Sequence, residues 1–247
     1  MNIAEKLTTI AENVPKVYEA GQQAENNAFW DIITANGTRE NYMYAFHNWG
    51  MEYIRPNRKI VPKAQNSSCQ MFNACRLLKK VEKDCFDLSN IPKGITVNSG
   101  YYYTWYDNKE LIEVEDIGIG RIAPYGYNYT WAGCSKLKYI WGMGFDANTL
   151  FDSVFNNCSE LEELRIYEGS VIGKSGVNIR WSTKLSKTSI ENIFAVLSTE
   201  TSGLSITLSK AAVNKAFETA EGLNDGSTST EWLELRATRT NWTINLL

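Results

Sequence analysis

One spacing of apolar and small residues recurs four times along this chain. The segments FNACRLLKKV, WYDNKELIEV, WAGCSKLKYI and FNNCSELEEL each place an aromatic residue, a Cys or Asn, a Leu and an aliphatic residue at intervals of three. Their aromatic residues are separated by 33, 26 and 24 residues, and they are Phe72, Trp105, Trp131 and Phe155. A recurrence of about 20 to 50 residues indicates a repeat architecture, and it constrains the fold more than any other feature of the sequence.

Each repeat unit is too short to bury its own apolar side, so it needs neighbouring units against which to pack. Equivalent positions would then stack into one continuous core. Asn108 takes the cysteine position in the second unit, because Asn and Cys are both small and both can meet backbone groups at a turn. Segments such as LKYIW and EELRIY, at the end of a unit, have the character of short strands. The pattern therefore predicts an α/β fold with one short parallel strand per unit.

The four units resemble the irregular bacterial leucine-rich repeats called BspA-like, whose pattern reads approximately F-x-x-C-x-x-L-x-x-I. The resemblance covers residues 60 to 210, and it departs from the family where Trp replaces Phe and where the links are rich in Gly and Tyr. It implies a curved solenoid that displays a binding face, and it implies no reaction. The termini are similar to those of repeat proteins encoded by gut-bacterial prophages. This likeness suggests a place on a cell surface or a virion.

The composition limits the kinds of partner that this protein is expected to bind. The net charge of −3 argues against nucleic acid, since phosphate binding needs a basic stripe. No stretch of about 18 apolar residues suggests insertion into a membrane. The N-terminus lacks the charged start and long apolar run of a signal peptide.

The five cysteines are expected to be buried and reduced, because three of them occupy the repeated position. A Cys69–Cys85 disulfide and a metal site are the alternatives. Because no CxxC pair occurs and His47 is the only histidine, the metal site has the weaker support. No cofactor is expected.

Three regions follow from the pattern. Residues 1–58 form a helical and aromatic N-terminal segment, residues 59–185 hold the repeats, and residues 186–247 form a helix–strand cap at the C-terminal end. The aromatic stretch YMYAFHNWGMEYI is expected to cover the first end of the repeats. In the last region, capping boxes at Thr188 and Thr228, a Ser209 cap and a stop at Gly222 predict three helices, with LSITL and NWTINLL as strands.

The N-terminal segment carries apolar residues with the spacing of a coiled coil. These are Ile3, Leu7, Ile10, Val14 and Val17. Pro15 interrupts the pattern, and Asn13 could cap a second helix there. Two interpretations remain open: a helix packed on its own chain, or one through which residues 1–20 join copies of the chain, perhaps as a trimer.

The exposed strand face is the candidate binding site. Because strand side chains alternate, the residues on either side of each repeated aliphatic position point away from the core. They are Lys80, Glu82, Glu113, Glu115, Tyr139, Trp141, Glu163 and Arg165. Tyr, Trp and Arg are favoured anchors for protein partners, and aromatic rings also stack on sugars. The alternatives are that a terminal segment folds over the aromatic pair, or that the runs at Tyr101–Tyr103 and Tyr125–Tyr129 bind instead.

These observations support three hypotheses of function. The first is a non-enzymatic recognition protein for a protein or glycan on a cell surface. The second is a structural component of a phage-like particle. The third is a carbohydrate-active enzyme that uses Glu113, Glu115 and Asp116, since paired carboxylates can hydrolyse glycosides.

Overall fold

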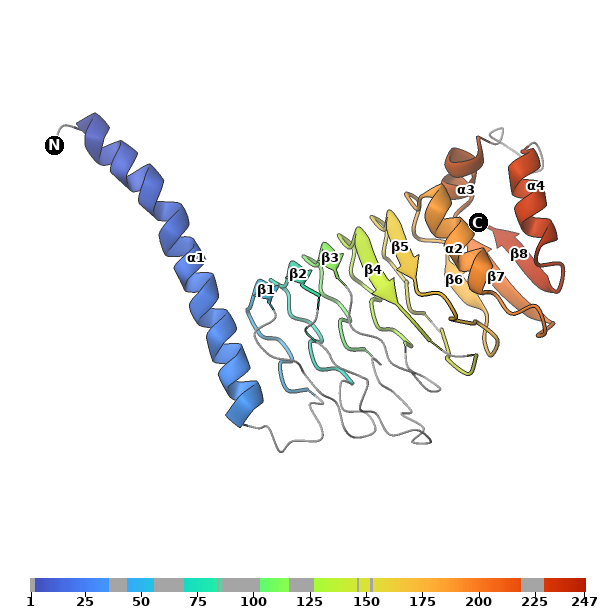
Figure 1. Ribbon diagram of the computed structural model, residues 1–247, viewed down its shortest axis with the longest axis horizontal. Helices are drawn as coiled ribbons and strands as arrows, with labels where there is room; N and C mark the ends of the chain where they lie inside the picture. Colours follow the sequence, from blue (N-terminus) through green and yellow to red (C-terminus); the bar gives the residue numbers. More distant parts are fainter. Residues whose placement is uncertain are drawn as a thin grey trace.

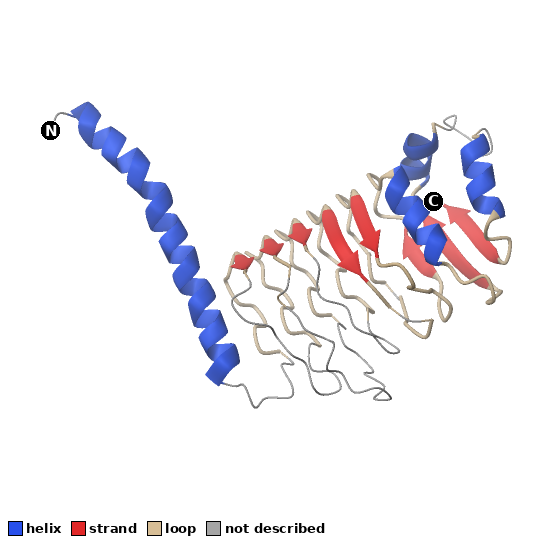
Figure 2. Cartoon of the chain, in the orientation of Figure 1, coloured by secondary structure: helices blue, strands red, loops and turns tan. Residues whose placement is uncertain are grey.

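The computed structural model is a mixed α/β protein with two parallel sheets and helices at both ends (Figure 1, Figure 2). It describes residues 3–35, 44–55, 69–83, 85, 103–115, 127–145, 147–151, 153–218 and 229–247. Helix α1 (Ile3–Ala35) leads into a five-stranded sheet of β1 (Tyr53–Ile54), β2 (Lys80–Val81), β3 (Glu113–Val114), β4 (Tyr139–Met143) and β5 (Glu163–Ile166). The second sheet consists of β6 (Val177–Ile179), β7 (Leu204–Leu208) and β8 (Trp242–Leu246). Around it lie α2 (Lys187–Val196), α3 (Lys210–Phe217) and α4 (Thr230–Ala237).

Equivalent positions of the repeat units lie beside one another in the first sheet, as the sequence predicts. The strands pair in the order β1-β2-β3-β4-β5, and each repeated aliphatic residue is paired with its counterpart in the next unit. Val81 pairs with Val114, and Val114 pairs with Ile140. These aliphatic side chains and the leucines three residues before them are fully buried or nearly so.

Five aromatic rings form a continuous column through the units. Neighbouring rings are nearly parallel, with interplanar angles of 5° to 14° and centroids 5.6 to 6.3 Å apart. Because the rings stack in an offset manner, each one covers an aromatic face that its own unit cannot cover. The column consists of Phe46, Phe72, Trp105, Trp131 and Phe155.

The first ring of this column corrects the interpretation of the segment around it. The segment at residues 44–54 was expected to cover the end of the repeats, but it is itself a repeat unit, one residue shorter than the others, with strand β1 at its end. The first end is covered instead by α1, where Phe29 packs on Phe46 with ring centroids 4.6 Å apart. Trp30 donates from its indole nitrogen to the backbone oxygen of Arg55 at 2.6 Å. The repeats therefore begin before residue 59.

Two ladders of backbone hydrogen bonds join the units. On the turn side, the amides of the first four column aromatics each donate to a carbonyl of the following unit, as from Phe72 to Thr104 at 2.9 Å. On the strand side, amides donate to the preceding unit, as from Lys138 to Ile112 at 2.8 Å. Because both ladders run between units, no unit can satisfy its backbone groups alone.

The turns of all five units contain the same pair of left-handed residues. They stand two residues before and two residues after the column aromatic, with φ between 53° and 85°. Only Gly133 is a glycine, so the other nine positions hold residues for which this conformation is unfavourable. The pairs are Tyr44 and Asn48, Gln70 and Ala74, Tyr103 and Asp107, Tyr129 and Gly133, and Ser153 and Asn157.

The C-terminal part continues the stack and then ends it. Ile179, Ser182 and Leu185 are buried at the spacing of a further unit, and the Ser182 hydroxyl donates to the backbone oxygen of Cys158 at 3.0 Å. Where a sixth strand would follow, α2 begins, and the Ser189 hydroxyl accepts from the amide of Leu164 in β5 at 2.8 Å. The helix thus occupies the edge of the sheet and supplies a hydrogen-bond partner to the last strand.

The predicted C-terminal elements are present, with different boundaries. LSITL and NWTINLL form strands, and Ser209 caps α3 as expected. The caps of the other two helices were wrong: Ser186 caps α2 and Ser229 caps α4, in place of Thr188 and Thr228. Helix α3 ends at a left-handed Glu218, before the expected stop at Gly222, which lies outside the described residues.

The cysteines are free and buried, as the repeat pattern predicts, and the alternative Cys69–Cys85 disulfide is absent. The three template thiols each donate to the backbone oxygen of the column aromatic in the preceding unit: Cys75 to Phe46, Cys134 to Trp105 and Cys158 to Trp131, at 3.0 to 3.1 Å. Burial raises the pKa of the Cys75 thiol to about 12 and that of Cys134 well above its ordinary value. These thiols therefore stay protonated and can donate.

Asn108 differs from the three cysteines. It is fully buried in the same column, but neither its amide nitrogen nor its amide oxygen has a hydrogen-bond partner. The expectation that this amide would meet a backbone group was therefore wrong. A buried polar group without a partner costs about 1–3 kcal/mol.

Replacing the side chain at this position tests that cost. We expect Asn108→Cys to raise the free energy of unfolding by about 1–3 kcal/mol, because the thiol avoids the buried amide and can donate as its neighbours do. Urea unfolding measures the change. The reverse change in the next unit, Cys134→Asn, should lower stability by a similar amount. Equal stability of all three proteins would contradict the prediction.

The repeated leucines should carry a large share of the packing energy. Leu137 is fully buried between units on both sides, so Leu137→Ala is expected to lower the free energy of unfolding by about 2–5 kcal/mol. Leu77 is 51% exposed and provides the matched control, for which the same change should cost about 0.5 kcal/mol or less. Denaturant melts of the two variants that coincide would show that Leu137 is not a core residue.

Candidate functional site

The eight predicted site residues lie together on the exposed face of the five-stranded sheet. Strand β2 supplies Lys80, β3 supplies Glu113, β4 supplies Tyr139 and Trp141, and β5 supplies Glu163 and Arg165, while Glu82 and Glu115 follow their strands directly. Their neighbours across the sheet are set by the parallel register, in which Lys80 pairs with Glu113, Glu113 with Tyr139, and Tyr139 with Glu163. We call this set of eight residues the strand face.

The centre of the strand face is a stacked aromatic pair. The rings of Tyr139 and Trp141 are 5.3 Å apart with an interplanar angle of 10°. The guanidinium of Arg165 lies over the indole, 5.1 Å from its centroid, at a distance typical of a cation–π interaction. The indole nitrogen of Trp141 donates to Glu113 at 2.5 Å, and the Tyr139 hydroxyl donates to Glu162 at 3.2 Å. Strand β4 therefore holds both rings in fixed positions.

The aromatic pair is half-buried by the sheet itself. Among the described residues, the pair contacts side chains from β3, β5 and the residue before β5. Helix α1 and helices α2 to α4 lie at the two ends of the row of strands (Figure 1). The alternative that a terminal segment folds over the pair is therefore not what the structure shows.

Ion pairs surround the aromatic centre. Lys80 contacts both Glu113, at 2.9 Å, and Glu115, at 2.7 Å, and Arg55 contacts Glu82 at 3.3 Å. On the far side, Glu163 accepts hydrogen bonds from the hydroxyls of Ser186 and Ser189. The strand face therefore has an aromatic centre and a charged margin. Each carboxylate in that margin forms an ion pair or a hydrogen bond.

These contacts set the protonation states of two groups. Burial alone would lower the pKa of Lys80, but hydrogen bonds with Glu115 and Glu113 outweigh it and raise that pKa. Burial would raise the pKa of Glu115, but its bonds with Lys80 and the amide of Lys83 lower it below the ordinary value. Both groups are therefore charged across the neutral range.

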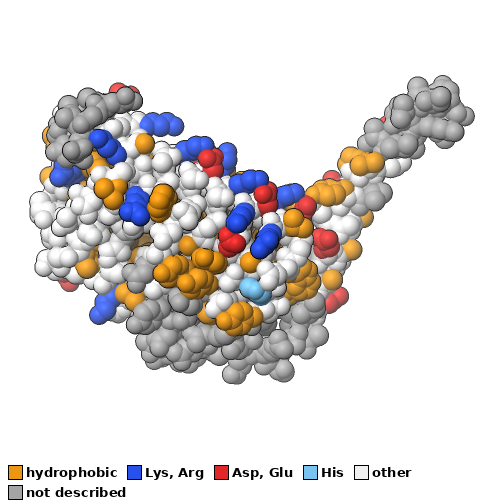
Figure 3. Space-filling model, turned by 180° about the vertical axis from the view of Figure 1, so that it is seen from behind, with side chains coloured by type: hydrophobic (Ala, Val, Ile, Leu, Met, Phe, Trp, Pro, Cys, Tyr) orange, Lys and Arg blue, Asp and Glu red, His pale blue; other side chains and the backbone are white. Residues whose placement is uncertain are grey.

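Further ion pairs connect neighbouring units beside the strand face. Lys136 and Glu110 are 2.7 Å apart, and Lys184 and Glu160 are 2.6 Å apart. Figure 3 shows Lys and Arg side chains interspersed with Asp and Glu on the face seen from behind. Exposed pairs of this kind contribute about 0–1 kcal/mol each to stability.

The described tyrosines of the two runs at Tyr101–Tyr103 and Tyr125–Tyr129 differ in their burial. Tyr127 is fully buried and donates to the backbone oxygen of Gly144, so it is a packing residue. Tyr103 and Tyr129 occupy left-handed positions of adjacent turns, and their rings stack 4.7 Å apart. Tyr101, Tyr102 and Tyr125 lie outside the described residues.

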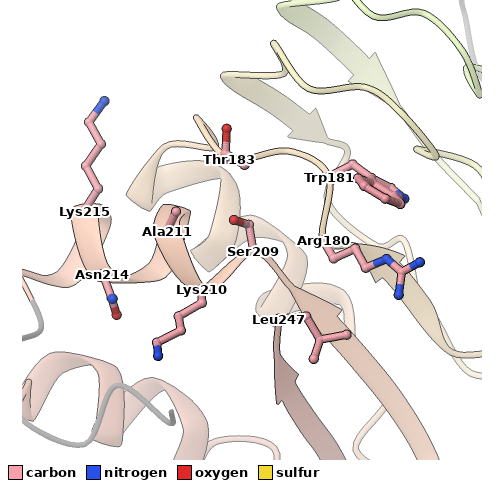
Figure 4. Close-up of a pocket in the computed structure, with 9 residues that line it drawn as sticks. All are labelled: Arg180, Trp181, Thr183, Ser209, Lys210, Ala211, Asn214, Lys215 and Leu247. Atoms are coloured by element: carbon pink, nitrogen blue, oxygen red, sulfur yellow. The ribbon is translucent and has the colours of Figure 1, made fainter. Parts of the chain in front are cut away.

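A second candidate is an open depression in the C-terminal part, with a volume of about 740 Å³ (Figure 4). No sequence motif indicates this depression, because the residues that line it come from segments distant in sequence. Arg180, Lys210 and Lys215 make it basic, and Trp181 is 41% exposed. In Figure 4 the two lysine side chains point in opposite directions, so the charges do not converge on one point.

Among the described residues, no cluster of three or more His, Cys, Asp or Glu side chains is placed to hold a metal ion. In the same part of the chain, no helix has the length and hydropathy that a membrane span requires.

Comparison with family models, with curated proteins and with solved structures finds no match to this chain.

The acid stability of the strand face follows from the lowered pKa of Glu115. A group with a lowered folded-state pKa stabilises the fold above its unfolded pKa, here near 4.5, and this contribution is lost as the pH falls through the folded-state value. We therefore expect Glu115→Gln to be less stable than the wild type at neutral pH, and the difference to shrink as the pH falls below 4.5. Urea melts over a pH series measure it.

The matched control is Glu168→Gln, which removes an exposed carboxylate outside the sheet. A difference for Glu115→Gln that stays constant down to the acid limit of folding would show that the ion pair with Lys80 does not stabilise the native state.

Proposed function

We propose that this protein is a non-enzymatic recognition protein, built as a leucine-rich-repeat solenoid of the irregular bacterial type, and that its strand face binds a protein or a glycan on a cell surface. The sequence motif suggests the repeat class. The parallel pairing of equivalent positions and the stacked aromatic column support it, because both are what a repeat of this kind needs in order to bury its core.

One observation carries the binding assignment. A stacked Tyr139–Trp141 pair lies half-buried on an open sheet face, with Arg165 against the indole and charged residues around it. An aromatic and arginine centre inside a polar margin is the arrangement of a binding hot spot and its rim. Because strand β4 and its neighbours fix the rings, a ligand would bind without the entropy cost of ordering them.

The carboxylates favour recognition over hydrolysis. A glycoside hydrolase needs one carboxyl group with a raised pKa to act as the acid. Here the pKa of Glu115 is lowered, and Glu113 is engaged by both Lys80 and Trp141. Asp116, the third residue of the enzymatic hypothesis, lies outside the described residues.

A structural role in a larger assembly is the second candidate. The observation that favours it is α1, which extends well beyond the sheet whose end it covers (Figure 1). Both roles are compatible in one molecule, since the helix and the strand face are separate surfaces.

Removal of one anchor tests the binding role. If Trp141 is a hot spot, Trp141→Ala should weaken binding by on the order of 2 kcal/mol, or about thirtyfold. Screening on a glycan array and on intact bacterial cells identifies a bound target, and titration with that target measures the loss. Trp181→Ala, at another partly exposed tryptophan, is the matched control and should bind normally.

Thermal melting of both variants separates binding from folding. A large fall in melting temperature for Trp141→Ala would show that this residue is needed for the stability of the fold. If Trp141→Ala changes neither binding nor stability, the strand face is not the binding site. The turn surface that carries Tyr103 and Tyr129 would then be the favoured site.

A further inference from the structure

We propose that the strand face recognises an acidic side chain of a protein partner, and that Arg165 is the residue that selects it. This inference rests on the proposed binding role of the strand face. It goes beyond that role because it decides between the two kinds of partner and names the chemical group that the partner must carry.

Among the described residues, Arg165 is the member of the strand face whose charged group forms no ion pair or hydrogen bond. The carboxylates of the strand face each accept from a cation, an indole or a hydroxyl, and Lys80 forms two ion pairs. The side chain of Arg165 is exposed, and the interaction that it makes within the described part of the chain is with the ring of Trp141. Glu163, two residues earlier on the same strand, is bonded by two serine hydroxyls instead. Because a guanidinium stays charged at every pH that proteins meet, its donors remain available to a ligand.

Contacts within the sheet hold this guanidinium in place. It lies 5.1 Å from the centroid of the Trp141 indole. The indole is itself fixed, because it stacks on Tyr139 and donates to Glu113 at 2.5 Å. A guanidinium presents planar N–H donors that match the two oxygens of a carboxylate, and stacking on an aromatic ring leaves these donors at its edge. A carboxylate from a partner would therefore meet a donor group that needs little further ordering.

A break in the register of the sheet lies at this point. Between two successive pairs of β4 with β5, two residues of β4, Trp141 and Gly142, stand opposite Arg165 alone. Such a bulge bends the strand and changes the direction of its side chains, and bulges are frequent beside functional sites. In this sheet the bulge coincides with the contact between the indole and the guanidinium.

The arrangement of the rings favours a protein partner over a glycan. A sugar ring stacks on an open aromatic face. Here the rings of Tyr139 and Trp141 stack on each other with an interplanar angle of 10°, and the guanidinium lies over the indole, so much of the ring surface is already in contact. Arg, Trp and Tyr are also the residues that most often anchor protein interfaces.

The charge of the partner follows from the surroundings of Arg165. A basic segment would bring a cation against the guanidinium, and it would have to displace an existing contact in order to reach a carboxylate of the strand face. An acidic side chain needs no such exchange, and the contact between like charges disfavours the wrong partner. The expected partner is a segment with Asp or Glu beside apolar or aromatic residues, which would cover the exposed parts of the two rings.

The test uses the full chain and peptides of known sequence. A phage-displayed library of random peptides, selected on the wild-type protein, should return peptides rich in Asp or Glu. For a synthetic peptide from this selection, Arg165→Gln should weaken binding by about tenfold or more, because a charged, hydrogen-bonded pair is lost. Replacing the acidic residue of the peptide with its amide should cost a similar factor, and the two changes together should cost little more than either alone.

Arg180→Gln is the matched control. Arg180 is also exposed and lies 4.8 Å from the ring centroid of a tryptophan, Trp181, but it is outside the strand face. This variant should bind the peptide as the wild type does. Equal melting temperatures of the wild type and both variants show that the fold is unchanged.

These measurements separate the role of Arg165 from the binding role of the strand face. If Trp141→Ala removes binding of the peptide and Arg165→Gln does not, the strand face is the site but Arg165 does not select the partner. A glycan ligand that Trp141→Ala no longer binds would also overturn the role of Arg165, and so would a selection that returns no binding peptide or only peptides without acidic residues. If neither variant changes binding, both roles are wrong.

Discussion

The column of five stacked aromatic rings is the constraint on which the rest of the structure depends. Each ring is covered by the rings of neighbouring units, at centroid distances of 5.6 to 6.3 Å, and no unit could bury its ring alone. Once Trp131 lies between Trp105 and Phe155, the Leu and aliphatic positions of the three units come into register, and the thiols of Cys134 and Cys158 reach the backbone of the preceding unit.

A stack of this kind has two open ends, and the chain closes them differently. At the first end, Phe29 of α1 packs against the ring of Phe46 and continues the aromatic packing. At the other end, Ser182 and Leu185 extend the stack by part of a unit, and Ser189 gives the last strand a hydrogen-bond partner. The outer strand positions of the interior units then lie outside the core. There Tyr139, Trp141 and Arg165 form an aromatic and charged surface in the middle of the sheet.

The proposed recognition role uses a part of the molecule that lies outside the core. The strand face would recognise a ligand, and its charged margin is held by contacts between neighbouring strands, in which Lys80 joins Glu113 and Glu115. The anchors of the site would therefore be in place before a ligand arrives.

The sequence alone determined the repeat positions, the parallel order of the strands, the buried cysteines and the eight residues of the strand face. It could do so because three-residue spacing and strand alternation are local rules that act within one unit. The tertiary structure decided what depends on contacts between units. It showed that the shortened segment around Phe46 is a repeat unit. Ring stacking and strand pairing are still possible when one residue is missing, but a pattern of fixed spacing does not recognise such a segment. It left the amide of Asn108 without a partner, and it closed the end of the sheet with Ser189. These outcomes depend on distances across the stack, and no spacing within a single unit encodes them.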